Sequence, residues 1–166
     1  GGVSRIVAGY DFVNNDTDPM DGHGHGTHCS GTIAGANDGT GITGIAFDAK
    51  IMPVKVLADA GWGRTSWIAA GVRWATDNGA DVINMSLGGG GYNQDFKDAI
   101  KYACDEGVVV AMSAGNSGRP APGYPAGYAV DYGIAVGAVD KSRDLAGFSN
   151  RAGPTTMDYI TAPGVA

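Results

Sequence analysis

The chain has 166 residues, of which 43% are hydrophobic and 17% are charged, and its formal net charge is −6. This composition suits one folded domain, or part of a larger one, and excludes a disordered tail. The negative charge argues against nucleic acid as a partner, because a phosphate-binding protein needs a basic stripe. No apolar run is long enough to cross a bilayer, so we expect no membrane partner.

Strands and helices are predicted to alternate along the chain. In chain order, the patterns predict strand 5–13, helix 26–36, loop 37–44, strand 49–57, helix 65–79, strand 80–89, helix 94–107, and strands 108–116, 132–140 and 158–164. Several strands are apolar throughout, which is typical of a parallel sheet covered by helices. The sequence therefore predicts an α/β fold with a mainly parallel sheet.

Glycine-rich segments follow several of the predicted strands, directly or after a loop. They are HGHGTH at 23–28, SLGGGG at 86–91 and SAGNSG at 113–118. In an open α/β sheet, functional groups lie beyond the carboxyl ends of the strands. We therefore expect the functional site to be built from these segments.

The first of these segments contains three histidines, His23, His25 and His28, followed by Cys29. One interpretation is a zinc site, with Cys29 or Asp21 as the fourth ligand. The spacing H-G-H-G-T-H is none of the usual zinc patterns, however. The other interpretation makes His25 a general base, because flanking glycines at a helix start leave its imidazole open to a cleft.

A histidine base needs a nucleophile, an acidic group that orients it and donors for the oxyanion. Asn116 lies in a glycine turn just after a predicted apolar strand, so its side-chain amide could donate to an oxyanion. The alternative is an asparagine with no role beyond the turn itself.

Three segments together resemble the subtilisin-like serine proteases: HGHGTHCSGTIAG, VINMSLGG and SAGN, in this order and spacing. The resemblance extends through GITGIAFDAKIMPVKVL, TSWIAAGVRWA and the stretch from GFSN to TAPGV. It implies a three-layer subtilisin-like fold, of which residues 1–166 form the central portion of a single peptidase domain. It also implies a secreted serine endopeptidase that acts on polypeptides after apolar residues.

The resemblance implies a role for each matching residue. His25 matches the general base, and Asn116 matches the oxyanion-hole amide. The two walls of the primary specificity pocket are matched by Ser86, Leu87 and Gly88 and by Ser113, Ala114 and Gly115.

Further residues match the binding segments of the family. The strand-like segment that pairs with substrate is matched by Gly61, Trp62 and Gly63. The pocket for the fourth residue before the cut is matched by Thr65, Ile68, Leu87 and Phe96. A calcium loop is matched by Ala36, Asp38, Thr40 and Ile42, and calcium is the implied cofactor.

The chain does not contain two motifs of the family. Residues 1–24 lack its Asp-Ser/Thr-Gly motif, and no Gly-Thr-Ser-Met-Ala follows the APG turn at 162–164. The nearest serines, Ser30 and Ser117, do not lie in a nucleophile turn. We therefore expect the 166 residues alone to be inactive, with the missing N- and C-terminal segments of the same domain as partners. The alternative is a non-catalytic peptide-binding or complementing fragment.

Cys29 and Cys104 are the only cysteines, and two cysteines do not make a disulfide framework. Two buried free thiols are expected, and a Cys29–Cys104 disulfide is the alternative. HGTHC resembles the branches of the family that carry a thiol beneath the catalytic histidine. Because Cys29 lies one helical turn after His25, we expect its sulfur beside the imidazole, on the side away from substrate.

Overall fold

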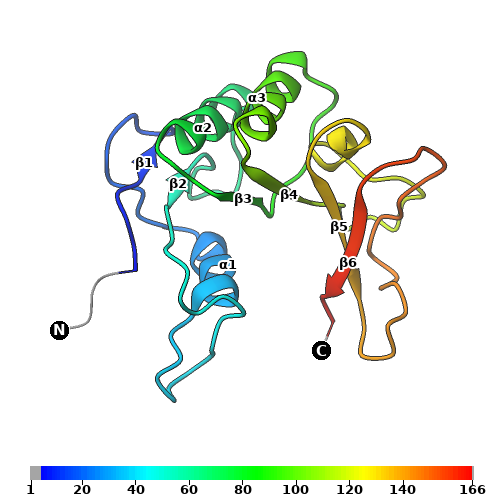
Figure 1. Cartoon of the computed structure of the whole chain (residues 1–166), viewed down its shortest axis with the longest axis horizontal. Helices are drawn as coiled ribbons and strands as arrows, with labels where there is room; N and C mark the ends of the chain where they lie inside the picture. The colour runs from blue at the N-terminus through cyan, green and yellow to red at the C-terminus, as the bar shows by residue number, and fades with distance from the viewer. Residues whose placement is uncertain (1–4, 166) are drawn as a thin grey trace. The chain divides into compact units, whose positions relative to one another are not determined.

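A computed structural model describes residues 5–165 of the chain. The chain divides into two compact units, an N-terminal unit of residues 1–71 and a C-terminal unit of residues 72–166. Helix α2 (Thr65–Asp77) runs across the boundary in sequence. Figure 1 labels the helices and strands of both units.

The N-terminal unit contains β1 (Tyr10–Asp11), α1 (His25–Ala34) and β2 (Val54–Lys55). β1 and β2 pair in parallel, and an isolated bridge joins Ile6 to Ile51. The predicted strands 5–13 and 49–57 are thus correct in place but too long. Pro53 has no N–H to donate, which limits the ladder on one side.

On the other side, the buried carboxylate of Asp11 ends β1. Its Oδ1 accepts from the backbone N–H groups of Val13 at 2.6 Å and Asn14 at 3.0 Å, so the chain turns immediately after the strand.

Helix α1 begins one residue earlier and ends two residues earlier than predicted. Its C-cap residue is Gly35, where another segment of the chain passes so closely that an added Cβ would lie 2.6 Å from the carbonyl oxygen of Ile42. Only Ala34 of this helix is buried among the described residues.

The C-terminal unit is built on a four-stranded sheet. Its strands are β3 (Val82–Met85), β4 (Val109–Ser113), β5 (Ile134–Val139) and β6 (Tyr159–Pro163), paired in the order β3-β4-β5-β6. Every pairing is parallel, with Val82 opposite Val109, Ala111 opposite Ile134 and Val136 opposite Ile160. The predicted parallel α/β sheet is therefore confirmed, although β3 and β4 end before the glycine turns that the predicted ranges included.

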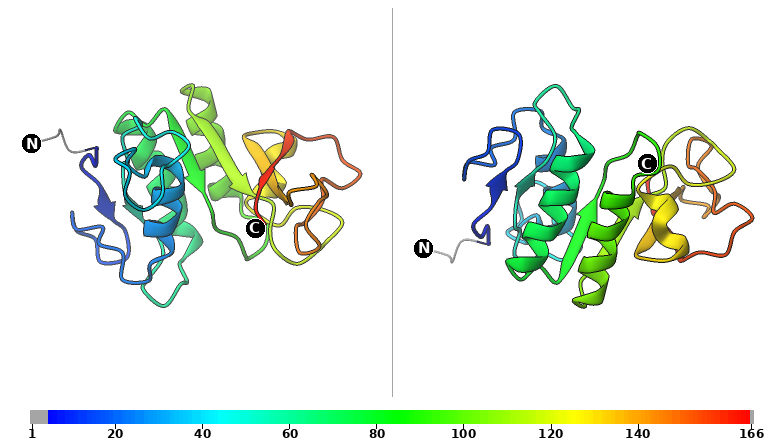
Figure 2. Two further views of the ribbon diagram at one scale, coloured as in Figure 1. Left: turned by 90° about the horizontal axis from the view of Figure 1, so that it is seen from below. Right: turned by 90° about the horizontal axis from the view of Figure 1, so that it is seen from above.

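Helix α3 (Gln94–Asp105) and the 3₁₀ helix η1 (Ala126–Val130) lie on the same side of this sheet, as Figure 2 shows from above and below. The core forms between α3 and the sheet, where the buried side chains are Phe96, Ala99, Ile100, Ala103, Val110, Met112 and Ala135. Alternation along the strands places Val82, Val109 and Ile160 on the opposite face, where they are exposed.

A helix cap and a side-chain contact between the helices hold α3 and η1 on that side of the sheet. The Asn93 side chain accepts from the Phe96 N–H at 2.9 Å and so caps α3. The Tyr128 hydroxyl of η1 accepts from the Asn93 N–H and donates to the Asn93 carbonyl. Sequence reasoning missed η1, because its glycine-rich and proline-flanked segment shows no helical periodicity.

Candidate active site

The candidate residues fall in both units. In the N-terminal unit, His25 is the first residue of α1, and its loop is tied down by Asp21. One carboxylate oxygen of Asp21 accepts from the backbone N–H groups of His23 at 3.0 Å and Gly24 at 2.8 Å. The other accepts from the backbone N–H and the hydroxyl of Thr27, both at 2.7 Å.

These four bonds replace a conventional helix cap. The N-cap residue is Gly24, which has a φ of 93° and no side chain that could accept from the first turn. Hydrogen bonds to Thr27 and Gly24 hold the pKa of the Asp21 carboxyl well below its usual range. Asp21 therefore stays ionised at neutral pH and fixes the residues on both sides of His25.

The imidazole of His25 is exposed to solvent and lies beside Cys29. Its Nε2 atom is 3.8 Å from the Cys29 Sγ, as their spacing of one helical turn predicts. Cys29 and Cys104 are both free and both half-buried, so the expectation of free thiols is confirmed and that of full burial is wrong. Cys29 remains partly accessible because α1 buries so little of its surface.

His23 and His28 are also exposed. The rings of His23 and His25 are 6.4 Å apart and nearly perpendicular. Within residues 5–165, no three His, Cys, Asp or Glu side chains are grouped so that they could hold a metal ion. The zinc interpretation therefore gains no support from the arrangement of these side chains.

The predicted substrate-pairing segment begins within a tight turn of the N-terminal unit. The Gly61 N–H donates to the Ala58 carbonyl, and the Ala58 N–H donates to the Trp62 carbonyl, each at 2.8 Å. The Trp62 ring stacks on Trp67 with centroids 5.9 Å apart, yet its side chain remains 55% exposed. Gly63 follows Trp62 and lies where an added Cβ would be 2.3 Å from the Val56 carbonyl oxygen.

The residues matched to the fourth-position pocket have different surroundings. Thr65 begins α2 and is exposed, while Ile68 is half-buried. Phe96 is only 5% exposed and packs edge-on against Tyr128 in the core of the C-terminal unit. Its burial suits a core residue at least as well as a pocket lining.

The predicted calcium residues are only partly brought together. Ala36 and Asp38 line a hollow of about 230 Å³ with Arg5, Asn37, Phe47 and Asp48, whereas Thr40 and Ile42 do not line it. The Thr40 N–H donates to Asp38 Oδ1 at 3.0 Å. Carboxylate and carbonyl oxygens suit calcium, but the Arg5 guanidinium brings a positive charge into the same hollow.

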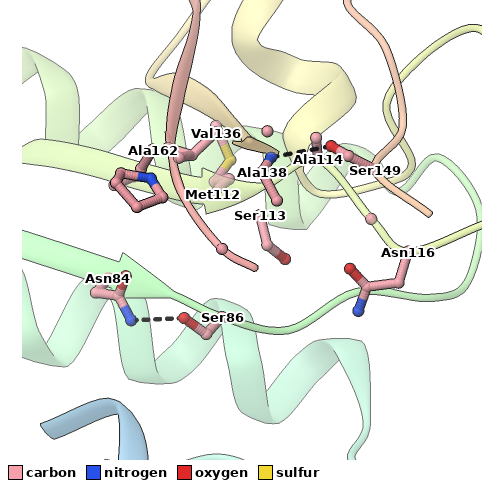
Figure 3. A pocket seen from close by; sticks show the side chains of 15 residues that line it. Asn84, Ser86, Met112, Ser113, Ala114, Asn116, Val136, Ala138, Ser149 and Ala162 are labelled. Atoms are coloured by element: carbon pink, nitrogen blue, oxygen red, sulfur yellow. Dashed lines mark hydrogen bonds between the residues drawn. The ribbon is translucent and has the colours of Figure 1, made fainter. Parts of the chain in front are cut away.

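In the C-terminal unit, a hollow of about 300 Å³ opens over the sheet. It is lined by residues of all four strands and of the turns beyond them, including Ser86, Ser113, Ala114, Gly115 and Asn116. Figure 3 shows the Asn116 side chain projecting from the turn that follows β4. The carboxyl-edge position expected for the site in a parallel sheet is thus occupied by these residues.

The two segments matched to the pocket walls contact each other. The Ser113 hydroxyl donates to the Leu87 carbonyl at 3.2 Å, and the Asn84 side chain donates to the Ser86 hydroxyl at 3.0 Å. Gly88 comes next in the chain, where an added Cβ would lie 3.6 Å from the Tyr124 carbonyl oxygen. Both segments are uncharged.

Sequence reasoning missed two residues that hold the candidate side chains in place, Asp21 and Asn150. The sequence suggests Asp21 as a zinc ligand and excludes it as the family's catalytic aspartate, whereas its position shortly before a helix start is also a capping signal. Asn150 is 3% exposed and bonds to the Asn116 turn, 31 to 36 residues earlier in the chain. No local pattern reveals so distant a partner.

The fold and these segments define an α/β protein whose candidate site lies at the carboxyl edge of a parallel sheet. A sequence model of the subtilase family matches residues 2–166, so the chain belongs to the subtilase family. It is 42% identical to thermitase of Thermoactinomyces vulgaris over 168 residues, which cover 97% of this chain and 60% of thermitase.

Two further comparisons agree. The chain is 43% identical to subtilisin DY of Bacillus licheniformis over 165 residues, which cover 97% of this chain and 58% of that protein. The crystal structure of a cold adapted subtilisin-like serine proteinase matches with a TM-score of 0.83 and 40% identity, over 96% of this chain and 56% of that chain. The chain thus spans about 60% of the length of such relatives.

Proposed function

We propose that this chain supplies the general base and the oxyanion-binding side of a serine endopeptidase. The observation that carries the proposal is the contact between Ser113 and Leu87, which joins the two expected pocket walls three residues before Asn116. Subtilase membership supports the same chemistry. His25 is the proposed base, and the Asn116 amide is the proposed donor to the oxyanion.

In the proposed reaction, His25 takes a proton from a serine hydroxyl as the serine attacks the peptide carbonyl, and then returns it to the leaving amine. The Asn116 amide donates to the oxygen on which negative charge develops. The serine and the acidic group that orients His25 come from polypeptide beyond residues 1–166. We use the term assembled peptidase for the complex or longer chain that contains all these groups.

The proposed substrates are polypeptides cleaved after medium-sized or large apolar residues. The wall residues carry no carboxylate that would attract a basic side chain. A peptide library varied at the residue before the cut tests this specificity. A strong preference for Arg or Lys would contradict it.

The test of the reaction is peptide hydrolysis by the chain combined with polypeptides that carry Asp-Thr-Gly and Gly-Thr-Ser-Met-Ala motifs. The 166-residue chain alone is expected to show no turnover, and the assembled peptidase to hydrolyse casein. His25→Ala is expected to abolish hydrolysis. Asn116→Ala is expected to lower kcat about 10²- to 10³-fold, a range measured in subtilisin itself and carried over here.

Two control variants sharpen this test. His28→Ala removes another exposed imidazole of α1, and Ser117→Ala removes the hydroxyl next to Asn116. Both are expected to retain activity. If the chain alone hydrolysed casein and Ser117→Ala stopped it, the nucleophile would be local and the proposal wrong. Binding of peptides without hydrolysis by the combined polypeptides would favour the non-catalytic alternative.

We also propose a structural calcium ion in the loop of residues 36–42 and a secreted location for the protein. The oxygen donors at Ala36 and Asp38 support the calcium proposal. No helix within the described residues is long and apolar enough to cross a membrane. Detection of the protein in culture medium would test the location.

A further inference from the structure

The turn that carries Asn116 has an unusual shape and needs support. It runs from Ala114 to Arg119, directly after β4, and Gly115 has a φ of 109° within it. An added Cβ at Gly115 would lie 2.5 Å from the side-chain nitrogen of Asn150. The Asn150 side chain is therefore packed directly against the backbone of this turn.

Asn150 hydrogen-bonds to the turn on both sides of Asn116. Its Oδ1 accepts from the backbone N–H groups of Ser117 at 3.1 Å and Arg119 at 2.9 Å. Its Nδ2 donates to the Ala114 carbonyl at 3.0 Å. The backbone N–H of Asn150 also donates to the Gly115 carbonyl at 3.0 Å. Four bonds from one residue thus bracket the backbone of Asn116.

Asn150 is itself held by the sheet. Its carbonyl accepts from the Tyr159 hydroxyl of β6 at 2.6 Å and from the Ser149 hydroxyl at 3.3 Å. The Ser149 hydroxyl in turn accepts from the Ala138 N–H of β5 at 3.0 Å. Asn150 therefore connects the turn to two strands of the sheet rather than to another loop.

The chemistry of this position requires an amide. An aspartate would keep the acceptor for Ser117 and Arg119 but would place a carboxylate oxygen against the Ala114 carbonyl, without a donor between them. It would also carry a charge into a site that is only 3% exposed, which is costly without an opposite charge. An alanine would leave two backbone N–H groups without their acceptor.

We propose that Asn150 is a positioning residue for the Asn116 side chain: it fixes the turn so that the Asn116 amide is held ready for the oxyanion. The inference rests on the proposed function, since it gives Asn150 an effect on the reaction through Asn116. Such preorganisation matters because an oxyanion donor stabilises the transition state only where its geometry is already set.

The first test compares kinetics of the assembled peptidase with and without Asn116. A displacement of about 1 Å can cost about 100-fold in rate. Asn150→Ala is expected to lower kcat about 10- to 100-fold and to raise KM by a smaller factor, because Asn150 also bonds to Ala114 and Gly115 of the expected pocket wall. In the Asn116→Ala background, the same substitution is expected to change kcat by less than about twofold, because the donor it positions is gone.

Tyr128→Phe is the matched control. Tyr128 is as deeply buried as Asn150, and its hydroxyl bonds to the backbone of Asn93, away from the Asn116 turn and outside the hollow that the turn lines. It is expected to lower the melting temperature with little effect on kcat. If Tyr128→Phe lowered kcat as much as Asn150→Ala, or if Asn150→Ala had its full effect without Asn116, Asn150 would act through general stability and the inference would be wrong.

A second measurement covers the case in which Asn150→Ala does not fold. Asn150→Ser adds no charge but has a side chain too short to reach both backbone N–H groups, so it is expected to be intermediate in kcat, and in the 166-residue chain its amide exchange is expected to rise at Ser117 and Arg119 while Val110 stays protected. Unchanged exchange at both turn amides would overturn the inference. An Asn116→Ala peptidase with unchanged kcat would instead contradict the proposed function, and the inference with it.

Discussion

The two candidate catalytic side chains are supported in opposite ways. The His25 loop is fixed by the charged side chain of Asp21, which bonds only to residues within six positions of itself and in an exposed setting. The Asn116 turn is fixed by the neutral side chain of Asn150, which is buried and lies more than 30 residues away in sequence. Neither supporting side chain belongs to the catalytic residues that the family resemblance implies.

Physical chemistry explains why the two supports differ. A carboxylate at the surface keeps much of its hydration and makes strong charge-assisted bonds to backbone N–H groups. Inside the protein, the same charge would cost several kcal/mol without a partner, whereas an amide offers a donor and an acceptor and carries no charge. Each turn therefore has the type of anchor that its exposure to water permits.

The largest effect is expected for a substitution in the turn that the buried Asn150 side chain holds in place. Gly115→Ala places a Cβ 2.5 Å from the Asn150 side chain and forces a φ of 109° on a residue that disfavours it. We expect a loss of about 3 kcal/mol in the unfolding free energy of the C-terminal unit. Urea unfolding of the 166-residue chain measures this loss.

Gly147→Ala is the control for that substitution. An added Cβ at Gly147 meets no atom within 4 Å, so its effect is expected to stay within about 0.5 kcal/mol. Equal losses in the two variants would show that the turn adapts easily and that Asn150 is not a rigid anchor.

The next largest effect is expected at Cys29, which lies beside the exposed His25 imidazole. A mercurial on Cys29 would add bulk 3.8 Å from the His25 Nε2 and displace the imidazole. We expect about 100-fold inhibition of the assembled peptidase, equal to about 2.7 kcal/mol in transition-state stabilisation. Cys29→Ser is expected to stay active and resist inhibition.

Cys104 provides the comparison within the same chain. Burial raises the pKa of the Cys104 thiol, which lowers its reactivity. Cys104→Ser is therefore expected to leave mercurial inhibition unchanged. Titration of the denatured, unreduced chain is expected to find two thiols, and a finding of none would establish the disulfide alternative.

The sequence predicts most of the secondary structure, but it does not predict the anchoring contacts of Asp21 and Asn150. Apolar strands such as β4 and the amphipathic α3 carry strong periodic signals, and both were placed correctly to within a few residues. The segments around His25 and Asn116 were located from their glycines and from the resemblance. The predicted strands around β1 and β2 are too long because a short strand extended by an isolated bridge has the same apolar pattern as a longer strand, and the turn that begins at Asp11 gives no apolar signal of its own.

The anchors themselves could not be predicted in the same way. Asn150 gives no periodic signal, because its role depends on a turn more than 30 residues earlier and on strands of the sheet. Asp21 does follow a known capping pattern, but its neighbouring histidines also suggest a metal ligand. Buried polar partners across long sequence distances are determined by the assembled fold rather than by local sequence.

A smaller effect is expected for Asp21. Asp21→Ala removes the acceptor for the first turn of α1 and is expected to cost the N-terminal unit about 1 kcal/mol at pH 7. Because the pKa of Asp21 is lowered by folding from its ordinary value of 3.8, its stabilisation is present above about pH 4 and is lost as the pH falls further. Unfolding measured between pH 7 and pH 2 checks both points.

The control for Asp21 is Asp18→Ala, which removes another exposed carboxylate from the same stretch of chain. It is expected to change stability by less than about 0.5 kcal/mol. Two results would show that the His25 loop does not depend on this carboxylate. The first is an unfolding free energy of Asp21→Ala equal to that of the unsubstituted chain at pH 7. The second is an equally steep loss of unfolding free energy in both chains as the pH falls.

The smallest effect is expected for calcium, whose proposed loop belongs to the same exposed part of the N-terminal unit as the His25 loop. At a calcium concentration equal to its dissociation constant, binding adds about 0.4 kcal/mol to stability. Asp38→Ala is expected to abolish this gain, and Arg5→Gln to enlarge it, because the guanidinium shares the hollow with Asp38. Amide exchange at Thr40 is the local measurement, with the buried Val110 of the C-terminal unit as the reference.

Magnesium is the control ion, and it should give the Thr40 amide little protection, since it demands a tighter octahedral set of ligands. If calcium still protected the Thr40 amide in Asp38→Ala, the ion would bind elsewhere. If the protection vanished, Asp38 would stabilise its loop through a bound ion. Asp21, by contrast, stabilises the His25 loop through hydrogen bonds alone.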